Sequence, residues 1–542
     1  MKFINSLKTN NVIPLLLFIS SSVITFSLGN LYYISTSGPD FDRYKVYIEY
    51  FYGFHDVTNL EQGVFYFFVI SLITKLRDGD RFLLFYDEFL SNTIQIGNFI
   101  FYVFGLLGMF YLLKKYKFKS NAIFLTFTCL NFFPPMLATR LIFKPEILCF
   151  SLLPWVLFLI KKYEEQKDYK YLLISIPLLS IIVNSKATVS LMIFIYLILN
   201  YTHLLKINKR ELVVIFILGT IFTAGIFIES QSHNSLYTFQ HQSPEGYKNN
   251  AEMSFAYNID PVRIYTNPFS NNHKDSFIGI TLLDTFGDYF NIYWNNDESG
   301  FKQNRHVLNN SKDRAHIGLL LTIVFYFFLI VSAFTHKRYR KYTTSVFIGS
   351  LTMLFISLFI QFDPTSGDMV KTYYYSFFLS LSFTFVTINY LSKMNFSKYL
   401  FVLIYIVTVS YLLGFPKEVN DLRNDLISTQ NETSLLCELN NSLFDVDSDC
   451  TDSVNKLCDV TYSKESRIEL VNGELEVFVN ADTIEIFSLD DNQIINVSSM
   501  EECLKYFDDI KNNQFPLPVP YLNIFFVLLP FTYIFLKKSS KY

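Results

Sequence analysis

The sequence predicts an all-α polytopic membrane bundle of about twelve transmembrane helices, with external amphipathic helices and a small C-terminal α+β domain. Three observations lead to this fold class. Of the 542 residues, 51% are hydrophobic and only 17% are charged, whereas a soluble domain carries about 25% charged residues. The apolar residues are concentrated in long runs. The segments between these runs alternate between short basic ones and longer acid-bearing ones.

A transmembrane helix needs about 20 mostly apolar residues. Runs of this kind start near Val12, Thr93, Ala122, Ile147, Tyr171, Val189, Leu212, Ile317, Thr344, Tyr374, Tyr399 and Tyr521. The N-terminal run is longer than a signal-peptide core of about 7–15 residues, so we interpret it as an uncleaved first span. The run 64–76 is short for a span and suits a helix that lies on the membrane surface.

Charge in the connecting segments predicts the topology. The short basic segments are 114–119, 161–170, 206–210, 337–341, 393–398 and the C-terminal tail. The longer, acid-bearing segments are 36–91, 138–146, 184–188, 229–315, 362–373 and 415–520. The two sets alternate strictly if the run 64–76 does not cross the membrane. The positive-inside rule then places the basic set and both termini in the cytoplasm.

This topology divides the chain into three parts. Residues 1–414 form a transmembrane module with external loops 36–91 and 229–315, residues 415–520 an extracytoplasmic domain, and residues 521–542 the last span and a cytoplasmic tail. In the external domain ELEVFVNADTIEIFSL alternates as strands do, and Asn472-Gly473 before it is a hairpin-turn signal. The same domain contains Cys437, Cys450, Cys458 and Cys503. Four cysteines in an oxidising compartment indicate two disulfides with three possible pairings, and free thiols are the alternative.

An acidic motif, Gly38-Pro39-Asp40-Phe41-Asp42-Arg43-Tyr44, directly follows the first span. Gly38-Pro39 ends a helix and turns the chain, and Asp40 is suited to cap a new amphipathic helix lying on the membrane. Two carboxylates at the outer mouth of a bundle can supply a general base and its partner. The alternative is that Asp40 is only a helix cap and Asp42 only a solvated charge.

A second group, RLIFKPE, lies at the outer junction of the third and fourth spans. The guanidinium of Arg140 and the ammonium of Lys144 can together hold a phosphate. The alternative is two cations that extend to the membrane interface, with Glu146 favoured by the helix dipole. Further candidates on the outer side are Glu61, Lys186, Lys371, Tyr374, Asp284 and Asp288. Each of these residues could instead be an ordinary polar or aromatic residue of the membrane interface. For the tyrosines 373–375, an aromatic belt at the headgroup level is the favoured interpretation.

Carboxylates and cations on one membrane face fit glycosyl transfer from a phosphate-linked sugar. The carboxylate takes a proton from the acceptor hydroxyl, and the cations stabilise charge on the leaving phosphate. A lipid or polysaccharide transporter would place its ionisable residues within the spans, often with inverted repeats, and no repeat is visible. A polysaccharide polymerase or ligase would use loop 229–315 and would not depend on Asp40. No basic domain stands out, so nucleic acid is not an expected partner.

GPDFDRY, EQGVFYFFVISL and RLIFKPE give the sequence a layout similar to the GT-C superfamily of membrane glycosyltransferases, which includes protein-mannosyltransferase-like enzymes and the aminoarabinose transferases. GPDFDRY resembles the acidic motif of the first external loop in that superfamily, and EQGVFYFFVISL resembles the helix that follows it. The resemblance covers roughly residues 1–400. The sequence departs from the superfamily in two features. The two acidic residues, which are neighbours in the superfamily, are here separated by one residue as Asp40-x-Asp42. The C-terminal domain does not match the superfamily.

The resemblance implies an inverting transfer from a polyprenyl-phosphate sugar, with Asp40 as the base and Asp42 as its partner. It implies phosphate contacts from Arg140, Lys144, Lys186 and Lys371. A hexose or pentose would pass to a glycan, glycolipid or protein acceptor. Some members use a divalent cation and others do not, so metal dependence stays open. We expect an integral protein of a bacterial inner (plasma) membrane, surrounded by membrane lipid, with an extracytoplasmic active site that serves cell-envelope polysaccharide or glycolipid synthesis.

Overall fold

The computed structural model describes the chain in separate stretches. They are residues 12–32, 44–45, 47–48, 51, 64–77, 86–141, 143–185, 187–202, 213, 217, 252–269, 273, 275–286, 312–359, 374–393, 401–403, 405, 466–469, 475–480, 483–488 and 493–497. The chain divides into two units. The first unit comprises residues 1–71, 94–416 and 519–542, and the second comprises residues 72–93 and 417–518.

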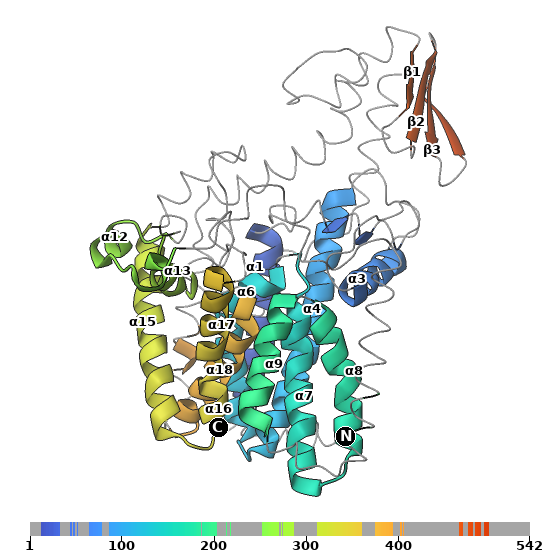
Figure 1. Ribbon diagram of the computed structural model, residues 1–542. Helices are drawn as coiled ribbons and strands as arrows, with labels where there is room; N and C mark the ends of the chain where they lie inside the picture. The colour runs from blue at the N-terminus through green and yellow to red at the C-terminus, as the bar shows by residue number, and fades with distance from the viewer. Residues whose placement is uncertain are drawn as a thin grey trace, which may run out of the picture. The chain divides into compact units, whose positions relative to one another are not determined.

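The described helices of the first unit pack side by side as a largely antiparallel bundle (Figure 1). In chain order, the described helices are α1 (Val12–Tyr32), α3 (Val64–Arg77), α4 (Tyr86–Lys115), α5 (Ser120–Asn131), α6 (Pro134–Leu141), α7 (Ile147–Gln166), α8 (Lys170–Ser185), α9 (Ala187–Tyr201), α11 (Ser254–Tyr257), α12 (Pro261–Thr266), α13 (Phe277–Asp284), α15 (Lys312–Thr335), α16 (Arg340–Thr343), α17 (Ser345–Phe359) and α18 (Ser376–Leu391).

Three described helical segments are long and apolar enough to cross a membrane, namely Asn92–Lys115, Ala315–Thr335 and Arg340–Phe359. Shorter apolar helices cover Val12–Ser27, Lys170–Val183, Val189–Tyr201 and Ser376–Leu391. These helices lie at predicted spans. The runs near Leu212 and Tyr521 fall almost wholly outside the described residues, so the total of twelve stays a prediction.

The third predicted span is not one continuous helix. α5 ends at Asn131 and α6 begins at Pro134, because two consecutive prolines lack the backbone N–H that would continue the helix. Proline is well suited to the first turn of a new helix. The predicted external segment 138–146 is therefore helical at its start, since α6 extends to Leu141.

Helix α18 is the centre of the bundle. It contacts α5, α6, α7, α15, α16 and α17, and most of its residues are buried. Its small hydroxyl side chains bond to neighbouring helices: Ser376 Oγ accepts a 2.7 Å hydrogen bond from Thr139 on α6, and Ser382 Oγ lies 2.8 Å from Ser345 Oγ on α17. Small polar residues of this kind let helices approach closely in a membrane.

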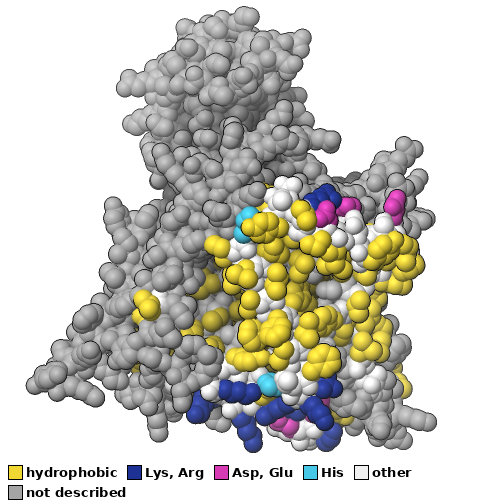
Figure 2. Space-filling view, turned by 90° about the vertical axis from the view of Figure 1, so that its left-hand side faces the viewer, with side chains coloured by type: hydrophobic (Ala, Val, Ile, Leu, Met, Phe, Trp, Pro, Cys, Tyr) yellow, Lys and Arg dark blue, Asp and Glu magenta, His cyan; other side chains and the backbone are white. Residues whose placement is uncertain are grey.

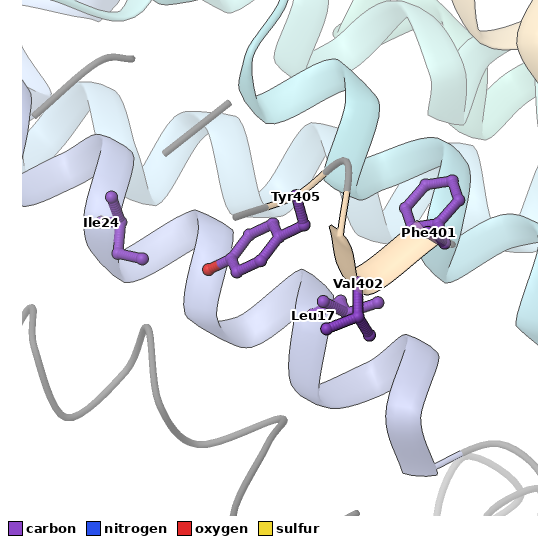
Figure 3. Packing of buried hydrophobic residues seen from close by; sticks show 5 residues of the cluster. All are labelled: Leu17, Ile24, Phe401, Val402 and Tyr405. Atoms are coloured by element: carbon purple, nitrogen blue, oxygen red, sulfur yellow. The ribbon is translucent and has the colours of Figure 1, made fainter. Parts of the chain in front are cut away.

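Helix α1 packs against residues 401, 402 and 405. Leu17 and Ile24 on α1 form a buried cluster with Phe401, Val402 and Tyr405 (Figure 3). The first predicted span and the run near Tyr399 are therefore neighbours in space, although they are far apart in sequence.

Helices α4 and α7 meet at two glycines. A Cβ added at Gly105 would lie 2.8 Å from the backbone oxygen of Phe150, and one added at Gly108 would lie 2.8 Å from Trp155. Trp155 Nε1 also donates a 2.9 Å hydrogen bond to the backbone oxygen of Phe104. The close approach of the two helices thus requires glycine on α4.

We expect Gly105→Ala to lower the stability of the protein by about 1–3 kcal/mol, because the backbone oxygen of Phe150 cannot move aside as a side chain could. Thermal unfolding of the purified protein in detergent measures this. Leu107→Ala, at an exposed position on the same helix, is the matched control. Equal unfolding temperatures for Gly105→Ala and the wild type would contradict the packing argument.

The basic connecting segments meet at one end of the bundle. Lys115, the last residue of α4, pairs with Glu165 on α7 over 2.8 Å. Arg338 after α15 donates a 3.2 Å hydrogen bond to the backbone oxygen of Tyr116. Lys393 after α18 lies within hydrogen-bonding distance of the segment after α15. Figure 2 shows Lys and Arg side chains gathered along this end, as expected if these segments lie on one side of a membrane.

The surface above this basic end is apolar (Figure 2). On α15 the side chains of Leu320, Phe327 and Phe334 are among many large hydrophobic groups that are exposed. A continuous apolar face of this extent fits lipid tails and not water. Together with the helices long enough to cross a bilayer, it identifies an integral membrane protein.

The described strands belong to the second unit. They are β1 (Ser466–Glu469), β2 (Leu475–Asn480), β3 (Thr483–Ser488) and β4 (Gln493–Val497), and they form an antiparallel sheet in the order β1-β2-β3-β4. β2 and β3 coincide with the alternating segment ELEVFVNADTIEIFSL, and Asn472-Gly473 precedes β2. The rest of the predicted domain 415–520, with Cys437, Cys450, Cys458 and Cys503, lies outside the described residues.

Candidate active site

An aromatic cluster joins three segments of the bundle. It comprises Tyr44, Tyr47, Tyr66, Phe67 and Phe143, all buried. The ring centroid of Tyr44 lies 5.7 Å from that of Phe143 and 5.1 Å from that of Phe67, and Phe67 lies 5.8 Å from Phe143. Tyr44 ends the motif GPDFDRY, and Phe143 belongs to RLIFKPE. The cluster therefore packs the end of the acidic motif against the segment that is predicted to bind phosphate.

Arg140, in the last turn of α6, is buried inside the protein. Its side chain packs on α4, where the guanidinium carbon lies 4.9 Å from the ring centroid of Tyr102 and 6.0 Å from that of Phe99. Only 2% of the residue is exposed. Burial lowers the pKa of Arg140 to about 10, so the group still carries its charge at neutral pH.

Two of the guanidinium nitrogens of Arg140, Nε and Nη2, have no hydrogen-bond partner among the described residues. These atoms share one edge of the guanidinium plane, and that edge binds two oxygens of a phosphate or carboxylate side by side. A buried charge with open donors is costly for stability. The chemistry of this edge is suited to an anionic ligand.

Asn98 and Tyr66 hold the backbone at Arg140. Asn98 Nδ2 donates a 2.9 Å hydrogen bond to the backbone oxygen of Arg140, and the Tyr66 hydroxyl donates a 2.8 Å hydrogen bond to Asn98 Oδ1. Burial raises the pKa of Tyr66; the hydrogen bond to Asn98 opposes this rise, and the charge of nearby Glu146 adds to it. These contacts link α3, α4 and α6 at the backbone of Arg140.

Lys144 and Glu146 lie in the short connection between α6 and α7. Both are buried, with 2% and 0% of the residue exposed. A cation that snorkels keeps its charged head in water, so burial argues against that interpretation for both Arg140 and Lys144. Glu146 directly precedes α7, where the helix dipole favours a negative charge.

The start of α7 and the end of α8 lie close together at this end of the bundle. Cys149 Sγ, in the first turn of α7, lies 3.7 Å from Ser185 Oγ in the last turn of α8. Lys186 follows Ser185 in the sequence. The C-terminal end of α8 therefore lies at the end of the bundle that holds Glu146.

Tyr374 and Asp284 are the remaining predicted residues that the structure describes. Tyr374 is buried and comes two residues before Ser376, which bonds to Thr139 beside Arg140. Asp284, at the end of α13, is 3% exposed and close enough to Tyr375 to interact with it electrostatically. Both residues thus lie at the end of the bundle that holds Arg140.

The other predicted residues lie outside the described part of the chain. They are Asp40, Asp42, Glu61, Lys186, Lys371 and Asp288. Within the described ranges, no three His, Cys, Asp or Glu side chains gather in a group that could hold a metal ion.

Sequence reasoning missed Asn98, Tyr66 and Tyr102. Asn98 stands inside the apolar run that starts near Thr93, and a polar residue within a span commonly has a functional partner. That signal was available from the sequence. The role of Tyr66 and Tyr102 depends on which ring faces Arg140, and only the packed structure shows this.

Residues 62–227 match the family described as dolichyl-phosphate-mannose-protein mannosyltransferase. This match confirms the resemblance to GT-C membrane glycosyltransferases. It includes Arg140 and the two residues that hold it, Asn98 and Tyr66, whereas Asp40 and Asp42 precede it. No curated protein matches the chain. The family match supports a membrane glycosyltransferase of the GT-C type in general.

Proposed function

We propose that the protein is an inverting glycosyltransferase that moves a sugar from a polyprenyl-phosphate donor to an acceptor at the extracytoplasmic membrane face. The observation that carries this proposal is the Nε–Nη2 edge of the buried Arg140 guanidinium, which has no hydrogen-bond partner in the described part of the chain. It lies within the segment that matches the mannosyltransferase family. By its description that family uses a sugar linked to a lipid phosphate, and the phosphate of such a donor fits this edge.

In the proposed reaction the Asp40 carboxylate, supported by Asp42, takes the proton of an acceptor hydroxyl. The acceptor oxygen forms a bond to the anomeric carbon from the face opposite the leaving group. The bond from that carbon to the phosphate oxygen breaks, and its electron pair leaves with the phosphate. Arg140 binds the phosphate and stabilises the added negative charge. Lys144, Lys186 and Lys371 are proposed as further phosphate contacts.

The aromatic cluster supports a role for the acidic motif near Arg140. Tyr44 packs on Phe143, which is three residues from Arg140, and Asp42 and Asp40 precede Tyr44 by two and four residues. A fully extended chain spans about 3.6 Å per residue at most. Chain connectivity therefore limits the Cα atoms of Asp42 and Asp40 to about 7 and 14 Å from that of Tyr44.

The basic cluster supports the proposed side of the membrane. The basic segments meet at the end of the bundle opposite the connection between α6 and α7 (Figure 1). By the positive-inside rule that end faces the cytoplasm, so Arg140 faces outward.

The test is a membrane assay with a panel of polyprenyl-phosphate sugars, in which release of the polyprenyl phosphate is measured. Sealed vesicles of known orientation give the side of the reaction. Turnover should require an acceptor on the extracytoplasmic side. Failure of every donor in the panel, or turnover from the cytoplasmic side alone, would refute the proposed function.

We expect Asn98→Leu to raise the KM for the donor several-fold while kcat changes less, because Asn98 fixes the backbone that presents Arg140 to the phosphate. Tyr66→Phe should have the same effect in weaker form, since it removes only the hydroxyl that orients Asn98. Leaving a buried amide oxygen unpaired costs about 1–3 kcal/mol. Assays below the unfolding temperature of each variant separate this stability loss from the effect on KM.

The matched control is Asn389→Leu. Asn389 is a buried amide on α18 that makes no described hydrogen bond to the Arg140 backbone. An unchanged donor KM in Asn98→Leu, or an equal rise in both variants, would remove Asn98 from the positioning role.

A further inference from the structure

The described residues 252–269, 273 and 275–286 form a compact platform of three short helices beside the start of α15. Asp260 caps α12 by accepting a 2.9 Å hydrogen bond from the backbone N–H of Arg263. Arg263 Nη1 lies 2.9 Å from both carboxylate oxygens of Asp275, and Asn258 Nδ2 donates to the same carboxylate over 3.0 Å. These bonds fix α11 and α12 to the segment that leads into α13.

The platform exposes large apolar side chains. Met253, Tyr257, Ile259, Val262 and Tyr265 are 61%, 72%, 46%, 72% and 66% exposed. We call these five residues the platform patch. Five such groups within thirteen consecutive positions are more than scattered surface hydrophobics, and a patch of this kind marks a contact surface.

The patch is continuous with the apolar face of α15. The rings of Tyr265 and His316 stack with centroids 4.8 Å apart, and His316 Nε2 lies 2.7 Å from the backbone oxygen of Tyr265. His316 directly precedes Ile317, with which the exposed apolar face of α15 begins. Figure 2 shows hydrophobic side chains extending from this end of the molecule down α15 toward the basic end.

The position of the platform patch relative to α15 also fits a membrane interface. The patch lies at the start of α15, and the basic segment 337–341 follows the end of that helix. Tyrosine is favoured at the headgroup level because its ring is apolar and its hydroxyl is polar. The paired charges of Arg263 and Asp275 are partly exposed, as suits groups on the water side of such a surface.

We propose that the platform patch is seated in the interfacial region of the bilayer, in the leaflet at the start of α15. The occupant of the patch is lipid, and α11 and α12 act as a short interfacial anchor that lies on the membrane surface. The anchor fixes the height of the platform beside α13, whose last residue is Asp284. This proposal stands independently of the proposed reaction.

Hydroxyl-radical footprinting of the unaltered protein in lipid nanodiscs tests the proposal, with oxidation of each tyrosine read by mass spectrometry. Tyr169, 46% exposed at the basic end, is the internal control. If the patch faces water, Tyr257 and Tyr265 should oxidise faster than Tyr169, because they are more exposed. If lipid covers the patch, we expect them to oxidise at least about fivefold more slowly than Tyr169.

A second measurement identifies what covers the patch. Trp155 and Trp294 are first replaced by phenylalanine, so that Val262→Trp supplies the tryptophan whose fluorescence is measured. Lipids brominated near the headgroup should quench this fluorescence. Lys337→Trp, at an exposed position of the basic end, is the control for residues outside the lipid. Fast oxidation of Tyr257 and Tyr265, or no quenching of Val262→Trp, would overturn the proposal. Protection seen only in discs that hold two copies would instead assign the patch to a contact between copies.

Discussion

Arg140→Met is expected to lower kcat for transfer by about 10²–10³-fold while leaving the protein at least as stable as the wild type. Methionine is unbranched and apolar, and it fills part of the space over Tyr102 without carrying charge. The variant loses the Nε–Nη2 edge that would hold the leaving phosphate, so transfer fails. It also removes a buried charge whose two donors have no partner in the described structure, which is neutral or favourable for stability. Transfer assays and thermal unfolding without donor measure the two effects.

The matched control is Arg338→Met. Arg338 lies at the basic end and donates to a backbone oxygen, so its replacement should leave transfer unchanged. Arg140→Lys should be intermediate, because an ammonium offers a point charge and not a fork. A large fall in the unfolding temperature of Arg140→Met would show that Arg140 has a structural role.

Asp40→Asn is expected to lower turnover by about 10²–10⁴-fold, which is the usual contribution of a general base. Asparagine keeps the size of the side chain and its ability to cap a helix, so folding and membrane insertion should be intact. Release of polyprenyl phosphate in membranes measures turnover. Asp42→Asn, two residues away, should cost less, because Asp42 is assigned a supporting role.

Donor binding separates the two variants. A ligand that binds the folded protein raises its unfolding temperature. The donor should still stabilise Asp40→Asn, which retains Arg140, and should no longer stabilise Arg140→Met. Full turnover in Asp40→Asn would remove Asp40 from the base role, and loss of donor stabilisation in that variant would assign Asp40 to binding.

Much of the helical framework was predictable because it depends on local pattern. The apolar runs that start at Val12, Thr93, Ile147, Tyr171 and Ile317 all lie in helices of the structure. The run 64–76 is a single short helix, α3. The break in the third predicted span was also encoded locally, in Pro134-Pro135, although hydropathy alone treats that region as one run.

The candidate site was predictable only in part. Charge type and spacing singled out Arg140, Lys144 and Glu146, because a charge next to a membrane is costly and therefore informative. The sequence left two interpretations open for the cations, phosphate binding or extension to the interface. Burial of Arg140 on the ring of Tyr102 argues against the second.

By itself, the sequence determined the class of the protein: an integral membrane protein with long apolar runs joined in part by short basic segments. These properties follow from hydropathy and charge, which act locally along the chain. Only the tertiary structure decided that Tyr44 packs on Phe143, that Asn98 binds the Arg140 backbone, and that the Nε–Nη2 edge has no described partner. Contacts between residues more than 40 positions apart depend on how helices pack, and periodicity along the chain carries no record of them.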